Sequence, residues 1–293
     1  MKIKFIDKNF RYDSLALINL INTIADDYVS QGYTLTVRQM YYQLVARDLI
    51  ENTIRSYQKI AKLINEGKNA GLISWYAFED RTRAFIKNTH WDNPQQIINA
   101  AAEGYFESMW DSQSNYKVYV IIEKEALVGI LEATCAKYDV PILAARGYPS
   151  GTVLFDFFKK EIEPNPDKIH VILHLGDHDP SGIDMTRDLT DRMDMFSHSN
   201  YTLIVKRLAL NYNQIEELRP PKNPAKDTDS RFTSYVNKFG YSSWELDALN
   251  PSYLNSLVTK NIELHIDFST WEAKKYDIEG KKAQLKALAK TKF

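Results

Sequence analysis

The chain is poor in cysteine, glycine and proline. Its 293 residues include a single cysteine, Cys135, which excludes an intrachain disulfide and a zinc site built from several cysteines. With only 11 glycines and 10 prolines, the sequence has no low-complexity or collagen-like tract. Since 44% of the residues are hydrophobic and 26% are charged, the composition is that of a globular protein whose stability depends on its hydrophobic core.

Long apolar segments are also missing. Uninterrupted apolar stretches such as residues 118–122 fall far short of the ~20 residues that a transmembrane helix needs. Lys2, Lys4 and Asp7 interrupt the N-terminus before an apolar signal region could form. The sequence therefore predicts a cytoplasmic protein without a membrane span.

Neither sign of charge is in excess, because 37 lysines and arginines face 38 aspartates and glutamates. The net charge of −1 therefore does not indicate a polyanionic partner. Locally the balance differs, since residues 38–87 contain nine basic and five acidic side chains. Such a run is typical of a solvated helix face and also of a nucleic-acid contact, and charge alone does not separate the two.

Helical periodicity predicts three helices in the first part of the chain. The first begins after Asp13 and ends at Gly32, the second is capped by Thr36, and the third is capped by Asn52. In the second helix Tyr41 falls on the apolar stripe and is expected in the core, whereas Tyr42 shares a face with Arg38 and is expected to stand free to meet DNA. A strand over residues 72–78 is predicted next. This order is that of a winged helix-turn-helix, so residues 1–110 are predicted to form a DNA-binding domain. Its expected backbone contacts to double-stranded DNA are the basic residues on the outer face of the third helix, Arg55, Lys59 and Lys62.

From residue 116 onwards strands and helices alternate. A helix over residues 94–109 and a polar linker over residues 111–115 are expected to precede this region. The predicted strands cover residues 116–122, 140–145, 169–175 and 203–208, and the predicted helices cover residues 127–138, 151–162 and 181–196. This alternation predicts an α/β domain with a mostly parallel sheet, which spans residues 116–293 and ends in a helical extension.

Acidic side chains follow two of the predicted strands where each strand ends. Glu123 comes directly after the first strand, and Asp177 and Asp179 follow the third. Because the carboxyl ends of parallel strands meet at one edge of the sheet, the three carboxylates are expected to converge. Gathered carboxylates bind a hard divalent cation, so the sequence predicts a Mg²⁺ site that Mn²⁺ could also fill. Each acid taken singly is also typical of a helix cap or a solvated loop.

Three motifs together resemble a known family. Glu123 with the string Asp177-His178-Asp179-Pro180-Ser181-Gly182-Ile183 resembles the metal site of TOPRIM domains, in the form carried by the A subunit of topoisomerase VI and the related meiotic double-strand-break enzymes. Residues 146–150 resemble the Gly-Tyr-Pro loop of that family, and residues 37–42 resemble its Arg-x-x-aromatic-Tyr motif on a winged helix. Order and separation match over roughly residues 34–210.

The resemblance implies a DNA-cleaving topoisomerase activity, an isomerase reaction that depends on Mg²⁺. It makes Tyr42 the nucleophile, Arg38 its phosphate-contacting neighbour, and Glu123, Asp177 and Asp179 the metal ligands. The product would be a DNA break with a 5′-phosphotyrosyl enzyme. In the family the tyrosine of one subunit meets the metal site of the other, which implies a homodimer.

Other functions stay open from the sequence alone. In a metal-dependent nuclease, water would attack and Tyr42 would be structural, and in a non-catalytic DNA-binding subunit neither group would react. The segment before Arg38 is short and no P-loop occurs, so any ATPase or accessory subunit would be a separate protein. Asp184 is expected to lie next to the metal ligands without binding the metal itself. Residues 226–249 have no chemical assignment.

Overall fold

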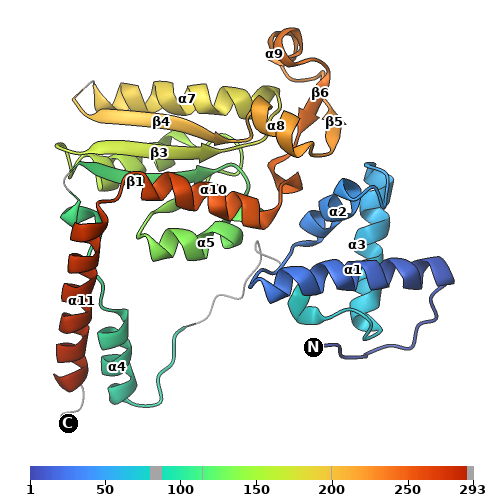
Figure 1. Cartoon of the computed structure of the whole chain (residues 1–293), viewed down its shortest axis with the longest axis horizontal. Helices are drawn as coiled ribbons and strands as arrows, with labels where there is room; N and C mark the ends of the chain where they lie inside the picture. Colours follow the sequence, from blue (N-terminus) through green and yellow to red (C-terminus); the bar gives the residue numbers. More distant parts are fainter. Residues whose placement is uncertain (80–87, 114, 199, 289–293) are drawn as a thin grey trace.

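A four-stranded parallel sheet forms the centre of the molecule. The computed structural model describes residues 1–79, 88–113, 115–198 and 200–288. The strands lie in the order β2-β1-β3-β4, and every neighbouring pair is parallel (Figure 1). Their bounds are β1 Tyr116–Ile122, β2 Ile142–Ala144, β3 Ile169–Leu175 and β4 Thr202–Ala209. The predicted α/β class is therefore confirmed, and β1 and β3 have the predicted ends.

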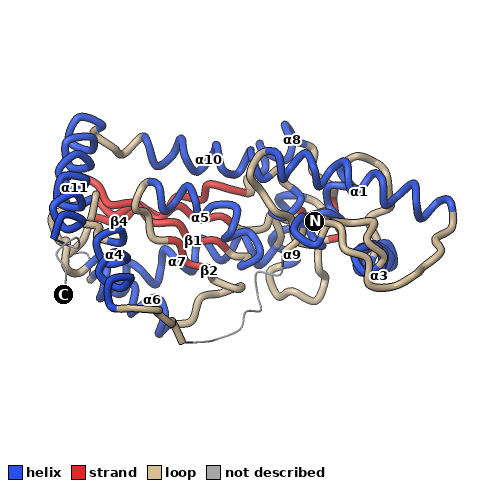
Figure 2. Tube along the Cα trace, turned by 90° about the horizontal axis from the view of Figure 1, so that it is seen from below, coloured by secondary structure: helices blue, strands red, loops and turns tan. Residues whose placement is uncertain are grey.

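Alternation along the strands builds a hydrophobic layer on each face of the sheet. Val120 and Ile122 pack in one cluster with α5 and α10, whereas Tyr119 and Ile121 pack in another with α6 and α7. Figure 2 shows α10 and α6 on opposite sides of the strands. The helices are α5 Val128–Lys137, α6 Gly151–Phe157, α7 Pro180–Ser197 and α10 Pro251–Glu263. Within the described residues, none of the helices combines the length and the apolarity needed to cross a bilayer.

The N-terminal part contains the three predicted helices, α1 Tyr12–Ser30, α2 Val37–Ala46 and α3 Ile54–Asn69. Thr36 caps α2 in a capping box with Gln39, as predicted for the start of this helix. The predicted cap of α3 is wrong by one residue, because Thr53 accepts the N–H of Ser56 at 3.1 Å. The Asn52 amide is used elsewhere, since it donates to Asn223 across the molecule.

The strand predicted over residues 72–78 is wrong. Residues Trp75–Ala77 form a single 3₁₀ turn, η1, and a lone bridge pairs Leu35 with Phe78. The N–H groups of Leu72 and Ile73 both donate to the carbonyl of Gly67 and so complete the end of α3. These donors are therefore not available for a strand ladder. The predicted continuation of this region over residues 80–83 lies outside the described residues.

The segment before β1 packs against the C-terminal helix. Helix α4 spans Pro94–Gly104, shorter than the predicted 94–109, and contacts α11, which spans Phe268–Leu288. The linker predicted over residues 111–115 is wrong for residues 111–113, because Trp110–Ser112 form a turn, η2, and Gln113 donates to Thr270 at 3.0 Å. Trp110 is fully buried, with its ring centroid 5.6 Å from that of Trp271.

Residues after β4 connect the sheet to the N-terminal helices. They form α8 Tyr212–Leu218, β5 Lys222–Pro224, α9 Phe232–Phe239, β6 Ser242–Trp244 and the turn η5 Leu246–Ala248. β5 and β6 pair antiparallel, and Trp244 also bridges His178 beyond the end of β3. Turn η5 contacts α2, and Ala248 is part of the N-terminal hydrophobic cluster. The segment from β6 to η5 therefore lies between the two parts of the molecule (Figure 1).

Two buried histidines at the end of β3 predict acid sensitivity. Burial lowers the pKa of His174 to about 3 and that of His178 to about 4, and both rings form hydrogen bonds, to Thr186 and Tyr235 respectively. These two histidines together therefore bind up to two more protons in the unfolded chain than in the native chain between pH ~6 and pH ~4, so their contribution to stability falls as the pH falls through this window. That contribution to the slope reaches about 2.7 kcal/mol per pH unit, and the raised pKa of Asp177 opposes it.

Urea unfolding at half-unit steps from pH 7 to pH 4 would measure this slope. The variant H174Q/H178Q should show a shallower slope over the same range, because neither glutamine titrates. If the wild type and this variant lost stability in parallel, the histidines would not be the cause.

Candidate functional site

The candidate site lies at the carboxyl end of the sheet, where the sequence places its acids. Glu123 follows β1, and its Oε2 accepts the backbone N–H of Asp177, which follows β3, at 2.8 Å. Gly176 allows this approach, because a Cβ at that position would lie 3.0 Å from the same oxygen. Burial raises the pKa values of both Glu123 and Asp177, and the ammonium of Lys124 opposes the rise.

Asp179 begins the next helix. Its Oδ1 accepts the N–H of Gly182 at 2.6 Å and the hydroxyl of Ser181 at 2.9 Å, so it is the N-cap of α7. Gly182 has no tolerance for a side chain, since a Cβ would lie 2.2 Å from the Asp177 carbonyl oxygen. The spacing of the Asp-x-Asp-Pro-x-Gly string is therefore explained by a helix cap folded tightly against the first Asp.

Arg207 fixes the loop that carries these acids. From β4, its guanidinium donates to the carbonyls of Gly176, Asp177 and Gly182 at 3.1, 2.6 and 2.7 Å. Burial lowers the pKa of Arg207 to about 10, against the opposing effect of the nearby carboxylates. The sequence motifs do not include Arg207, and the signal for it is weak, because Lys206 stands beside it in the same strand.

Lys124 neutralises several carboxylates at once and was also missed. Its Nζ lies 2.9 Å from Asp177 Oδ2 and 3.7 Å from Asp247 Oδ2, and it bonds to Glu245. Burial alone would lower the pKa of Lys124, but the three carboxylates around it together raise it. The backbone N–H of Leu246 donates to Asp177 Oδ1 at 2.7 Å. The segment from β6 to η5, for which no chemical role was predicted, thus supplies two of the acids of the site, Glu245 and Asp247.

Helix α2 places both Arg38 and Tyr42 near the carboxylate of Glu245. Arg38 donates to Glu245 at 2.8 Å and to Asp247 at 2.9 Å, and its Nη2 lies 3.5 Å from the Tyr42 hydroxyl. The Arg38 guanidinium also lies 5.6 Å from the centre of the Tyr42 ring. Burial, and then Glu245, raise the pKa of Tyr42, whereas Arg38 lowers it. Tyr42 is 5% exposed, so the expectation that it stands free on the helix surface is wrong.

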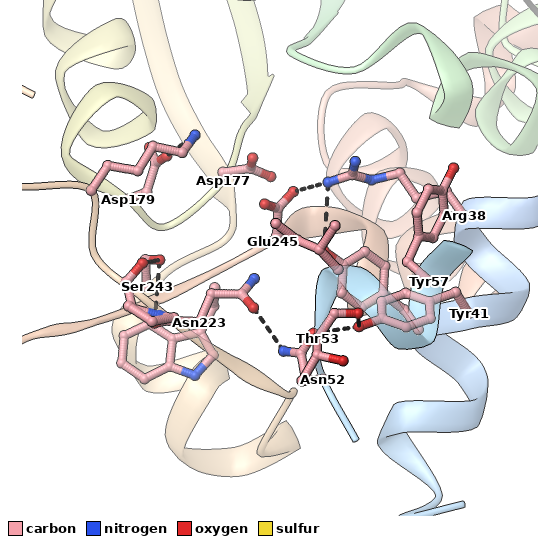
Figure 3. Close-up of a pocket in the computed structure, with 15 residues that line it drawn as sticks. Arg38, Tyr41, Asn52, Thr53, Tyr57, Asp177, Asp179, Asn223, Ser243 and Glu245 are labelled. Atoms are coloured by element: carbon pink, nitrogen blue, oxygen red, sulfur yellow. Dashed lines mark hydrogen bonds and ion pairs between the residues drawn. The ribbon is translucent and has the colours of Figure 1, made fainter. Parts of the chain in front are cut away.

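Some of these groups line one cavity of about 490 Å³ (Figure 3), whereas Glu123, Lys124 and Asp247 are not among its lining residues. From the N-terminal part, Arg38, Tyr41 and Tyr42 contribute to its wall. Asp177, Asp179 and Glu245 contribute from the α/β part. Tyr41 is buried as predicted, and its hydroxyl donates to Asn52 at 2.8 Å. The single chain therefore brings the tyrosine motif and the acidic motif together.

The remaining predicted residues lie elsewhere. Arg55, Lys59 and Lys62 are exposed on α3 and make no ion pair within the described residues. The other basic residues of this region, Arg81, Arg83 and Lys87, lie outside the described residues. Asp184 does not support the acidic site: it accepts from Tyr148 at 2.7 Å, Arg187 at 2.7 Å and Arg231 at 3.0 Å, beside a separate cavity.

The acids fit a hard divalent cation by the type of their donor atoms. Within the described residues, Oε1 of Glu123 accepts no hydrogen bond, whereas Asp177 uses one oxygen for Leu246 and the other for Lys124. As these side chains lie, the described part of the chain gathers no group of three acidic, histidine or cysteine residues that could hold a metal ion. The ammonium of Lys124 therefore occupies the Asp177 oxygen that a metal ion would need.

Comparison of the chain with protein-family models, with curated proteins and with solved structures finds no match.

Proposed function

We propose that the protein cleaves DNA by transesterification, with Tyr42 as the nucleophile and a divalent cation held by Glu123, Asp177 and Asp179. The observation that supports this most strongly is the shared cavity. A tyrosine with an arginine one helical turn before it opens into the same space as two aspartates from the end of a parallel sheet. The four groups come from separate parts of the sequence, and each part also matches the family motif.

Under the same proposal, the chain consists of a winged-helix domain and a TOPRIM domain. The three helices α1 to α3 form the helical part of a winged-helix domain, and the sheet with its helices forms a TOPRIM domain. The exposed basic residues of α3, Arg55, Lys59 and Lys62, contact the backbone of double-stranded DNA from outside the cavity.

The side chains of the cavity have separate parts in the reaction. The Arg38 guanidinium, which is 3.5 Å from the Tyr42 hydroxyl, contacts the phosphate and favours the phenolate of Tyr42. Phosphate binding requires Arg38 to exchange at least one of its two carboxylate partners. When bound, the metal would neutralise charge on the phosphate oxygens.

Hydrolysis is the second candidate function, and the burial of Tyr42 favours it. The ring of Tyr42 packs edge-on against Tyr41, with 5.1 Å between centroids, as a structural residue would. In that case water attacks, and Tyr42 only shapes the cavity.

Covalent trapping separates the two functions. Wild-type protein is incubated with supercoiled and linear DNA in Mg²⁺ or Mn²⁺, and the reaction is stopped with detergent. The DNA is then tested for protein attached to a 5′ end. We expect an adduct from the wild type and none from Tyr42→Phe. The matched control is Tyr41→Phe, the neighbouring residue on α2. It loses the hydroxyl that donates to Asn52 and to the Thr53 carbonyl, which costs about 1–2 kcal/mol, and it should keep the adduct.

Cutting without any adduct, retained in Tyr42→Phe, would support hydrolysis and reject the tyrosine nucleophile. Binding of DNA with neither cutting nor adduct in either metal would reject both functions.

A further inference from the structure

We infer that Glu245 is an internal substitute for the substrate phosphate: its carboxylate occupies the Arg38 guanidinium in the free protein, and a DNA phosphodiester has to displace it. This inference rests on the proposed function, in which Arg38 contacts the phosphate, and adds the residue that blocks this contact at rest. None of the sequence motifs includes Glu245.

The two carboxylates bound to Arg38 occupy different nitrogens of the guanidinium. Asp247 Oδ2 accepts from Nε at 2.9 Å, whereas Glu245 Oε2 accepts from Nη2 at 2.8 Å. Nη2 is also the nitrogen that lies 3.5 Å from the Tyr42 hydroxyl. Glu245 therefore binds the part of the guanidinium nearest the proposed nucleophile, which is the part that the reacting phosphate needs.

Burial distinguishes a permanent partner of Arg38 from an exchangeable one. The side chain of Asp247 is 1% exposed and is not among the residues that line the cavity. The side chain of Glu245 is 21% exposed and lines the cavity, where it points toward Arg38 (Figure 3). A ligand that enters the cavity can therefore replace Glu245, while Asp247 keeps the arginine side chain in place.

The exchange preserves the charge of the site. A phosphodiester and the Glu245 carboxylate each carry one negative charge, and the oxygens of both accept hydrogen bonds from a guanidinium. Glu245 also bonds to Lys124, whose ammonium lies 2.9 Å from Asp177 and so keeps a carboxylate partner when Glu245 leaves. Displacement by a phosphate therefore leaves neither Arg38 nor Lys124 as an unpaired cation.

The backbone on both sides of Glu245 is fixed, so the exchange needs only a rotation of its side chain. Before it, the backbones of Trp244 and His178 exchange hydrogen bonds of 2.9 and 3.0 Å. After it, the N–H of Leu246 donates to Asp177 Oδ1 at 2.7 Å. The flexible glutamate side chain borders a cavity of about 490 Å³, which gives it room to turn away from the guanidinium.

Displacement of Glu245 is required whether Tyr42 meets the acidic site of its own chain or, as in the family, that of a second copy. In both arrangements Arg38, one helical turn before Tyr42, contacts the phosphate that Tyr42 attacks. In the second arrangement, loss of the pair also removes one link between α2 and the acidic part of the same chain, which Glu245 contacts through Lys124. Glu245 therefore stabilises a resting state in either case.

Binding of a fluorescently labelled DNA duplex, measured by anisotropy in EDTA, tests the inference without cleavage. Glu245→Gln keeps the shape of the side chain and removes its charge, so Arg38 loses a charge-assisted partner. We expect this variant to bind the duplex about tenfold more tightly than wild type. The matched control is Asp247→Asn, which removes the same charge from the same guanidinium but outside the cavity, and it should bind no more tightly than wild type.

A double-variant cycle shows whether the gain in affinity depends on Arg38. In the Arg38→Gln background, Glu245→Gln should change the affinity by less than about twofold. An equal gain with and without Arg38, or an equal gain in Asp247→Asn, would mean that only the overall charge matters and would overturn the inference.

Chemical modification of Arg38 gives a readout that needs no DNA. Phenylglyoxal reacts with accessible guanidinium groups, and digestion followed by mass spectrometry measures the rate at each arginine. Relative to Arg55, which is exposed on α3, the rate at Arg38 should be higher in Glu245→Gln than in wild type. Equal relative rates in the two proteins would show that Glu245 does not protect the guanidinium.

Covalent trapping separates failure of this inference from failure of the proposed function. An unchanged affinity in Glu245→Gln, together with a 5′ adduct from the wild type, would overturn the inference and leave the proposed function intact. Absence of an adduct from the wild type would reject the proposed function, whereas an Arg38-dependent gain in affinity would still support the exchange of anions at Arg38.

Discussion

Arg38→Ala is expected to lower the free energy of unfolding by about 3 kcal/mol, because it leaves a buried carboxylate without its nearest partner. The side chain of Asp247 is 1% exposed, and its Oδ2 lies 2.9 Å from Arg38 Nε. Within the described residues the other oxygen, Oδ1, has no hydrogen-bond partner. Lys124 Nζ is 3.7 Å from Asp247 and remains as a partial counter-ion, so we expect the lower end of the range for a broken buried pair.

Urea unfolding of the single and double variants measures this effect. Asp247→Asn added to Arg38→Ala should recover about 1–2 kcal/mol, because the buried charge is then removed as well. Arg55→Ala on the neighbouring helix is the matched control and should stay within about 0.5 kcal/mol of wild type. A wild-type stability for Arg38→Ala would show that Asp247 does not depend on Arg38.

Lys124→Met is expected to have the second large effect, and its size should depend on divalent metal. Without metal, the carboxylates of Asp177, Glu245 and Asp247 lose their shared ammonium, which should cost about 3–5 kcal/mol. With the competing positive charge gone, a divalent cation should bind about tenfold more tightly than in wild type, a difference of about 1.4 kcal/mol.

Thermal unfolding over a Mn²⁺ titration measures both parts. Without Mn²⁺, the unfolding temperature of Lys124→Met should be lower than that of wild type. As Mn²⁺ is added it should rise by more than that of wild type, since a ligand at 100 times its Kd stabilises by about 2.7 kcal/mol. Lys159→Met, which removes an exposed partner of Glu163, is the control for loss of a surface ion pair. Equal responses to Mn²⁺ in Lys124→Met and wild type would show that Lys124 and the metal do not compete.

The sheet could be predicted from the sequence because its two central strands, β1 and β3, are buried on both faces. Continuous apolar runs such as residues 118–122 define a buried parallel strand, and the intervening helices exclude the main alternatives. Long helices with strong caps were equally predictable, as at Thr36. The position of Glu123 and Asp177 followed from the sheet alone, because it depends only on where two parallel strands end.

Local signals failed where a distant part of the chain decides the structure. Asn52 has the side chain of a typical helix cap, but its amide donates to Asn223, which lies 171 residues further along the chain. Residues 72–78 have the composition of a strand, but the N–H groups of Leu72 and Ile73 donate to the carbonyl of Gly67 at the end of α3. The roles of Glu245 and Asp247 also depend on distant partners, Lys124 and Arg38, so no spacing within residues 226–249 could indicate them.

The two hydrophobic clusters on either side of the cavity have a consequence for how this protein can diverge. One cluster is built almost entirely from α1 to η1, and the other from the sheet with α5, α10 and α11. Tyr41 and Tyr42 belong to the N-terminal cluster and also line the cavity, whereas among the described residues of the other side only Trp244 does both. Substitutions that repack the N-terminal interior therefore reach the cavity wall directly, so the packing of that half and the chemistry of the cavity have to change together.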